Sequence, residues 1–200
     1  PVPERQAALA ETVEIIDGVW RPQPFTFHGQ YHVVADARIV PPAVQRPRPP
    51  LILAGGGERV GLRLAARYAD ACNFGPGHAS GLARSADEIR RKIDALRRHC
   101  AVEGRPFDSI LRTHFTSWLM VAPDAAATAA KRDRYYPQGL NEEQRHSRVI
   151  GAPVEVAAYY QALVDLGMQY FVVQVQDAED VETIELFARE VMPRIVARAA

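Results

Sequence analysis

Residues 51–74 read LILAGGGERVGLRLAARYADACNF, and this stretch decides the fold class. It opens with the continuous apolar run Leu51 to Ala54, which is typical of a strand buried on both faces. Gly55, Gly56 and Gly57 follow, and residues 58–68 then carry apolar side chains at helical spacing. Residues 70–74 form a second short apolar run. The stretch therefore predicts strand, glycine turn, helix and strand, which is one unit of a parallel α/β sheet.

The same alternation continues through the rest of the chain. We expect strands over residues 51–54, 70–74, 110–121 and 170–176, and helices over residues 58–68, 85–100, 154–166 and 181–191. Asp124 caps a further alanine-rich helix, and residues 132–148 are expected to be helix and loop. Upstream, the pattern predicts a helix over residues 5–20 and a hairpin with a proline-rich connector over residues 21–50.

Two architectures fit these four strand–helix repeats. One is a small, open, doubly wound sheet, and the other is part of a (β/α)8 barrel, for which roughly 250 residues is usual. The first helix has no strand before it, which is the arrangement expected of a chain cut in mid-barrel. We therefore expect residues 1–200 to form a single partial domain.

The overall charge and composition argue against several function classes. The 24 Lys and Arg residues balance 24 Asp and Glu residues, whereas binders of nucleic acid or anionic membranes normally carry a basic excess. No apolar run approaches the ~20 residues that span a bilayer. Cys72 and Cys100 are expected to be buried thiols in a reducing cytoplasm, with a disulfide as the alternative. The six histidines show no metal-ligand spacing, so no metal is expected.

The glycine turn is the best candidate binding site. Bare backbone amides at the start of a helix form an anion site, and glycine lets a phosphate approach the main chain closely. Arg59 could add charge there or could be an ordinary solvated residue. The spacing matches neither the dinucleotide-binding G-x-G-x-x-G pattern nor a Walker loop. A tight turn that merely needs glycine remains the alternative.

Three polar residues on strands are weaker candidates. Asn73 ends a strand, where it could meet a ligand or bond a loop backbone. Gln176 shares an alternating face with Tyr170, so it could line a substrate site inside a barrel. His114 lies inside a strand and is expected to be a core residue. The residues support no nucleophilic triad and no catalytic carboxylate pair, so the catalytic residues stay unknown.

Residues 51–74 resemble the luciferase-like monooxygenase superfamily, and most closely its branch that uses the deazaflavin coenzyme F420. The shared pattern is an apolar strand, a glycine pair or triplet, and a helix ending in Ala-Ala-Arg-Tyr-Ala-Asp, here residues 65–70. Further similarities are the Phe27-His28-Gly29-Gln30-Tyr31 hairpin, the prolines of residues 41–50, and residues 151–156 at a helix start. Only residues 132–148 fall outside the resemblance. Ala152 departs from the family by replacing the usual hydroxyl-bearing helix cap.

The resemblance implies the C-terminal half of a TIM (β/α)8 barrel, with about four βα units. It implies a flavin- or deazaflavin-dependent oxidoreductase that transfers hydride to or from a small organic molecule. Ala54, Gly55, Gly56, Gly57, Arg59 and Asn73 would bind coenzyme F420, or FMN in an FMN-dependent monooxygenase. The residues facing the reactive edge of the cofactor would lie in the missing first half, so this fragment alone would be inactive. A homodimer is also implied.

A non-enzymatic reading competes with this one. The chain could be a half-barrel that binds a phosphate-bearing ligand, or nothing, and serves as an assembly module. Half a barrel leaves unpaired strand edges and an apolar inner face, which favour dimerisation or aggregation.

Overall fold

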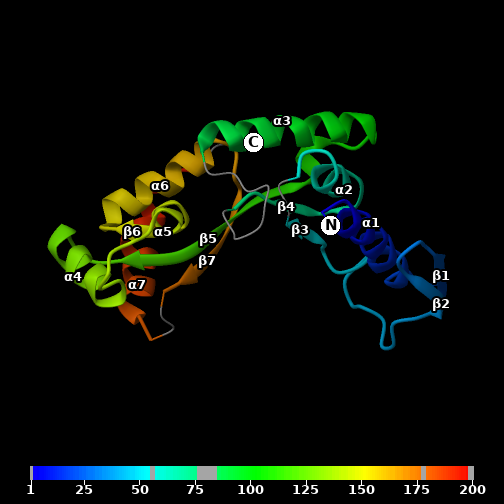
Figure 1. The fold of residues 1–200 in the computed structure, drawn as a ribbon, viewed down its shortest axis with the longest axis horizontal. Coiled ribbons are helices and arrows are strands. Elements are labelled where there is room, and N and C mark those ends of the chain that lie inside the picture. Colours follow the sequence, from blue (N-terminus) through cyan, green and yellow to red (C-terminus); the bar gives the residue numbers. More distant parts are fainter. Residues whose placement is uncertain (1, 55–56, 76–84, 177–178, 198–200) are drawn as a thin grey trace. The chain divides into compact units, whose positions relative to one another are not determined.

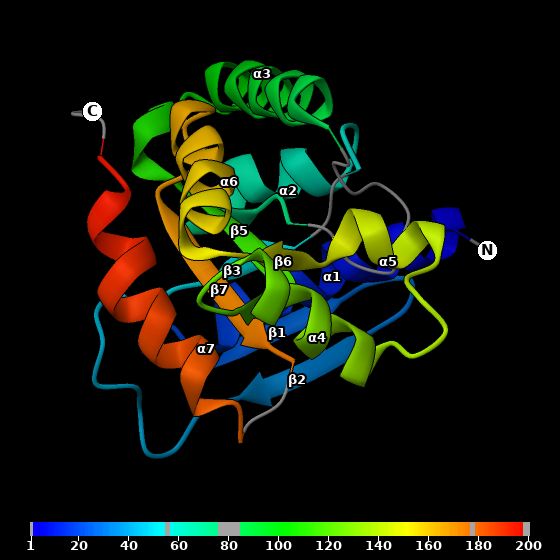
Figure 2. The same ribbon diagram turned by 90° about the vertical axis from the view of Figure 1, so that its left-hand side faces the viewer.

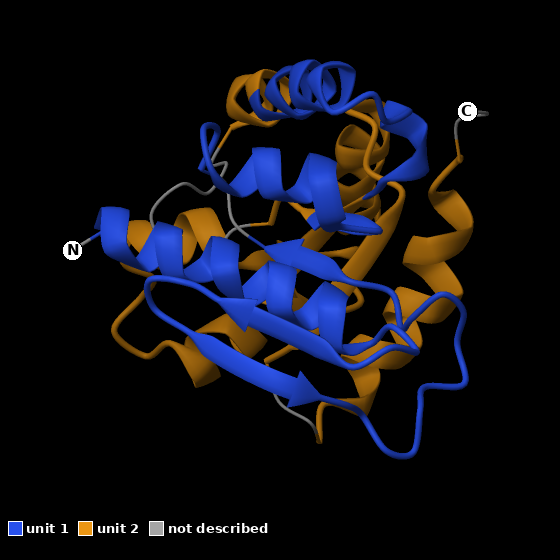
Figure 3. Cartoon of the chain, turned by 90° about the vertical axis from the view of Figure 1, so that its right-hand side faces the viewer, with its two compact units in different colours: residues 1–72, 92–111 blue, residues 73–91, 112–200 orange. Residues whose placement is uncertain are grey.

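The computed structural model describes residues 2–54, 57–75, 85–176 and 179–197 (Figure 1). Gly55 and Gly56 of the predicted turn lie outside the described residues. The chain divides into two compact units, which are described separately (Figure 3). Unit 1 comprises residues 1–72 and 92–111, and unit 2 comprises residues 73–91 and 112–200.

Unit 1 contains the elements expected on both sides of the proline-rich connector. They are α1 (Val2–Val19), β1 (Phe25–His28), β2 (Val33–Ala37), β3 (Ile52–Ala54), α2 (Gly61–Tyr68), most of β4 (Ala71–Asn73), the later turns of α3 (Ala86–Val102) and the 3-10 helix η1 (Phe107–Ser109). β1 and β2 form the predicted antiparallel hairpin, and β3 lies beside β4. Leu62, Ala66 and Leu96 are fully buried and form part of the core of this unit.

Glu11 ties the hairpin of unit 1 to its first helix. The carboxylate of Glu11 accepts hydrogen bonds from the backbone amides of Gln30 (2.7 Å), Tyr31 (3.0 Å) and His32 (2.9 Å). Burial opposes ionisation, but these three amides hold the pKa of Glu11 below its ordinary value. A Cβ at Gly29 would lie 2.3 Å from the Glu11 carboxylate, so glycine lets the carboxylate approach the hairpin this closely without a shift.

Unit 2 is built on three parallel strands. Its elements are the start of α3, β5 (Leu111–Val121), α4 (Ala125–Tyr135), α5 (Glu142–Ser147), β6 (Val149–Gly151), α6 (Pro153–Asp165), β7 (Tyr170–Val175), α7 (Val181–Leu186), the π-helical turn η2 (Phe187–Val191) and the 3-10 turn η3 (Met192–Arg194). β6 and β7 both pair with β5 in parallel, which confirms the predicted strand direction. The short strand β6 was not predicted, whereas α5 lies within residues 132–148, which were expected to be helix and loop.

The caps that the sequence predicts are present. The side chain of Asp124 accepts a hydrogen bond from the amide of Ala127 at 2.8 Å and so begins α4. Ser85 Oγ accepts one from the amide of Glu88 at the start of α3. Gly167 follows α6 in the left-handed region, with a φ of 97°. At the start of α6, Glu155 bonds the amide of Ala152 at 2.9 Å, which offsets the missing hydroxyl cap.

Within unit 2, α6 and α7 lie beside β7 (Figure 2), and alternate side chains of the strand meet different surroundings. Phe171 packs edge-on against Tyr160 of α6, with ring centroids 5.2 Å apart, and Tyr160 also contacts Phe187. Tyr170 and Val172, on the alternate face, remain 52% and 41% exposed. Phe171 therefore packs on a helix as expected, whereas Tyr170 and Val172, on the face that the sequence assigns to the interior of a barrel, are exposed in this partial barrel.

Candidate functional site

The glycine turn of unit 1 joins β3 to α2. β3 ends at Ala54, which is exposed, and the backbone oxygen of Gly57 accepts a hydrogen bond from Leu62 at 3.1 Å. A Cβ placed on Gly57 would come no closer than 3.7 Å to Gln6 and 3.9 Å to the Gly61 amide nitrogen. Packing therefore does not require glycine at this position, and the space beside the start of α2 can receive a ligand atom.

The start of α2 has the electrostatics of an anion site. Its N-cap is Val60, which has no side-chain oxygen to bond the first amides of the helix. Those amides and the helix dipole together favour a negative group, and the neighbouring Arg59 is exposed and positively charged. The residues present thus fit a phosphate group, although α2 begins three residues later than the sequence predicts.

Asn73 belongs to unit 2 and serves its own loop. Its side-chain oxygen accepts a hydrogen bond from the amide of Gly75 at 3.1 Å, as in the alternative of a bond to loop backbone. Gly75 lies so close to Phe115 that an added Cβ would be 2.3 Å from the Phe115 backbone nitrogen. The Phe74 backbone amide donates a hydrogen bond to the backbone oxygen of Thr113 at 2.8 Å, which holds this turn against β5.

Gln176 lies just beyond the carboxyl end of β7 in a half-buried polar cluster. The backbone nitrogen of Gln176 donates a hydrogen bond to the backbone oxygen of Leu119 at 3.1 Å. The parallel pairing of β7 with β5 therefore extends one residue past the end of β7. The side-chain oxygen of Gln176 accepts a hydrogen bond from the hydroxyl of Tyr136, and Arg148 Nε donates to the same hydroxyl at 2.8 Å. Tyr136 and Arg148 were not predicted as site residues, because they lie in the segment that the resemblance leaves out. In the sequence, these two residues are marked only by lying in the segment that the resemblance does not cover.

His114 is confirmed as a core residue. It is 2% exposed, and its ring lies 6.2 Å from that of Tyr159 and 6.3 Å from that of Phe171. Burial lowers the pKa of His114 to about 4, so the side chain is neutral at pH 7. Thr116 accepts a hydrogen bond from the Tyr160 hydroxyl at 3.0 Å, within the same buried region.

A charged network closes the carboxyl end of β5 in unit 2. Lys131 Nζ donates to the Val121 oxygen at 3.1 Å and to Asp180 Oδ1 at 2.6 Å. Thr183 donates to the same Val121 oxygen at 3.1 Å. Burial opposes ionisation of Asp180, but the bonds from Lys131 and Thr183 keep its pKa below the ordinary value. The sequence patterns missed this network, which fixes α4 and α7 onto the strand.

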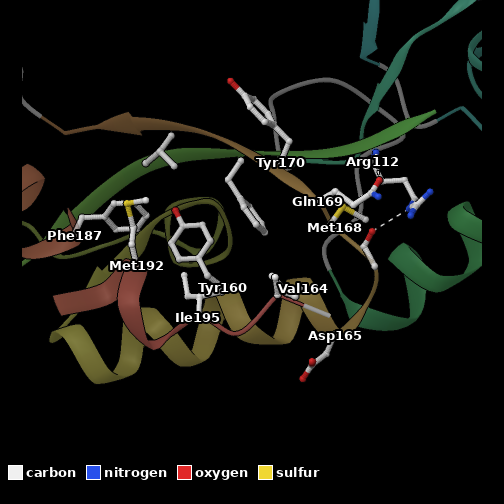
Figure 4. A pocket seen from close by; sticks show the side chains of 14 residues that line it. Arg112, Tyr160, Val164, Asp165, Met168, Gln169, Tyr170, Phe187, Met192 and Ile195 are labelled. Carbon is white, nitrogen blue, oxygen red and sulfur yellow. Dashed lines mark hydrogen bonds between the residues drawn. The ribbon is translucent and has the colours of Figure 1, made fainter. Parts of the chain in front are cut away.

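An apolar cavity of about 630 Å³ lies within unit 2, beneath β7 (Figure 4). Its walls include Tyr160, Met168, Phe187 and Met192, with Arg112 at one end. The cavity takes in Tyr170, the first residue of β7, whereas Gln176 follows the last residue of that strand. Ligand sites of α/β folds lie at the carboxyl ends of strands, so this cavity is not the site that the sequence predicts.

Two other kinds of site are absent from the described ranges. No cluster of three or more His, Cys, Asp or Glu side chains suited to a metal ion occurs there. Among the same residues, no helix is both long enough and apolar enough to span a membrane.

Comparison with known proteins places the chain in a family. Residues 1–178 match the family model described as luciferase-like monooxygenase. The chain belongs to this family. It is 25% identical, over 96% of its length and 62% of the relative's, to an F420-dependent glucose-6-phosphate dehydrogenase of Segniliparus rotundus (strain ATCC BAA-972). It is 30% identical over 92 residues, a quarter of the relative's length, to an FMNH2-dependent dimethylsulfone monooxygenase of Pseudomonas putida.

Solved structures of other proteins show the same fold as this luciferase-like chain. An F420-dependent secondary alcohol dehydrogenase matches with a TM-score of 0.77 at 18% identity, over 98% of this chain and 63% of the other. EDTA monooxygenase from Chelativorans sp. BNC1 matches with a TM-score of 0.70 at 20% identity, over 96% and 59%. The predicted fold class is thus confirmed as a partial luciferase-like TIM barrel. The chain spans less than two thirds of the length of each of these relatives.

Proposed function

We propose that the protein containing this luciferase-like chain is a coenzyme F420-dependent oxidoreductase, and that this chain supplies the site for the cofactor phosphate. The observation that carries the proposal is the start of α2, where an atom added at Gly57 would sit at ordinary contact distances beside helix amides that have no side-chain cap. The family includes F420-dependent and FMN-dependent members, which fits a phosphate-bearing redox cofactor.

In this proposal Ala54, Gly55, Gly56 and Gly57 form the cradle, and Arg59 adds positive charge at its edge. The cofactor supplies hydride transfer when it is bound. The chain's own contribution is to bind and orient the phosphate through backbone amides. Asn73 is proposed to act indirectly, by shaping the loop after β4 through its bond to Gly75. The substrate is proposed to be a small organic molecule, the protein to work as a homodimer, and its location to be the cytoplasm.

The sharpest test uses Gly57→Ala in the complete protein. The structure leaves ordinary contact distances around the new methyl group, so folding should be unaffected, whereas a phosphate in that space would be displaced. We expect weaker binding of coenzyme F420 by fluorescence titration, and complete loss with Gly56→Asp through charge repulsion. Ala101→Asp, at an exposed position of α3, adds the same charge and should bind normally.

The titration also separates the alternatives. Tighter binding of FMN than of F420 would replace the proposal with an FMN-dependent monooxygenase, the activity for which the P. putida relative is named. Saturable binding of neither cofactor to the folded, complete protein would favour a non-catalytic assembly module. Unchanged affinity in both glycine variants would remove the turn from the cofactor site.

A further inference from the structure

The cluster of Gln176, Tyr136 and Arg148 lies entirely within unit 2 and fixes the orientation of one side chain. Arg148 directly precedes β6, Tyr136 ends α4, and Gln176 follows β7, so three separate elements converge on it. The Arg148 guanidinium also lies over the Tyr136 ring, with its central carbon 5.3 Å from the ring centroid. Both contacts restrain the phenol.

The direction of each hydrogen bond follows from the chemistry of the donors. A guanidinium group can only donate, so the Tyr136 oxygen must accept from Arg148 Nε at 2.8 Å. The phenol proton is then directed to the side-chain oxygen of Gln176. The side-chain oxygen of Gln176 is thus bonded to the phenol, and the NH2 group lies on the other side of the amide. Within residues 2–54, 57–75, 85–176 and 179–197, no acceptor is recorded for that NH2 group.

We propose that Gln176 is a specificity-determining residue that donates a hydrogen bond to a carbonyl oxygen of the substrate, and that Tyr136 and Arg148 are its positioning residues. The inference rests on the proposed function, because it assumes that the carboxyl ends of the strands face the reaction. The NH2 group of this half-buried residue can form a hydrogen bond with an acceptor oxygen of a substrate, but not with a hydrocarbon.

The test follows the side-chain amide signal of Gln176 by proton–nitrogen NMR in the complete protein. The signal is assigned as the one missing in Gln176→Glu, which keeps the shape but removes the donor. The probes are cyclohexanone and methylenecyclohexane, which differ only in the acceptor oxygen. We expect cyclohexanone to shift the Gln176 signal in a saturable way and methylenecyclohexane to leave it in place.

The positioning role is tested with Tyr136→Phe, which removes the hydroxyl and frees the amide to rotate. We expect a roughly two- to tenfold weaker apparent affinity for cyclohexanone, the worth of one neutral hydrogen bond. Tyr135→Phe, which removes a hydroxyl one position earlier, should bind cyclohexanone as the wild type does. Thermal melting checks that each variant is folded.

Three results would overturn the inference: equal shifts with both probes, no shift with either, or wild-type affinity in Tyr136→Phe. These readings need no bound cofactor. Failure of coenzyme F420 and FMN to bind would therefore count against the proposed function, while the amide shifts would still decide the role of Gln176.

Discussion

Acidification is expected to destabilise unit 2 through His114, which the fold keeps neutral. The ordinary pKa of histidine is 6.5, and burial lowers that of His114 to about 4. The pKa of His114 is lower in the folded state than in the unfolded state. The neutral side chain therefore makes its full contribution to folding stability above pH 6.5. This contribution is lost progressively as the pH falls from 6.5 towards 4. At 1.36 kcal/mol per pH unit, the gap between the two values corresponds to roughly 3 kcal/mol.

The assay is urea unfolding at several pH values between 7.5 and 4.5, followed by circular dichroism. The free energy of unfolding of the wild type should fall by roughly 1.4 kcal/mol for each pH unit below 6. His114→Gln removes the titrating group, so its stability should be lower at pH 7.5 but flatter with pH. His146→Gln, at an exposed position, serves as the matched control and should follow the wild type. Parallel curves for the wild type and His114→Gln would refute the assignment.

Four further predictions concern the rest of the chain. Gly75→Ala should destabilise the protein by roughly 3 kcal/mol in chemical denaturation, because the new methyl group meets the Phe115 backbone. Glu11→Gln should lower the melting temperature at pH 7, and by progressively less as the pH falls below 4.5, since the wild-type carboxylate with its lowered pKa stabilises the hairpin fully above that pH and is protonated on acidification. Cys72, whose pKa burial raises to about 12, should resist a thiol reagent in native protein and react after unfolding. The 200-residue chain by itself should show no turnover with coenzyme F420 or FMN; measurable turnover would contradict the half-barrel argument.

The regular elements could be predicted because local sequence and tertiary packing agree there. In β7, the exposure of the side chains alternates along the strand as the sequence predicts. Phe171 packs on Tyr160, whereas Tyr170 is exposed. Capping signals such as Asp124 fixed helix starts to within a residue, since a side-chain oxygen must bond a specific amide. At such positions one residue type satisfies one local requirement.

Other features could not be predicted, because residues distant in the sequence determine them. β6 has only three residues, and it is a strand because β5 offers a parallel edge from Leu119 to Val121. The register between β5 and β7 shifts after Thr116, and Trp118 adopts a φ of 61° there. A bulky aromatic residue in that region is strained, and no sequence pattern announces it. Long-range pairing decides both cases.

The residues of the candidate site also differ in whether neighbouring or distant residues determine their roles. The glycine turn stays a prediction as an anion site: the sequence shows glycines before a helix, and among the described residues only Gly57 can be compared with it. The roles of Asn73 and Gln176 depended on what each side chain meets. Asn73 meets its own loop at Gly75, whereas Gln176 meets Tyr136, 40 residues earlier in the chain. An amide at the end of a strand therefore marks a position, and only its hydrogen-bond partners show which of its two ends can face a ligand.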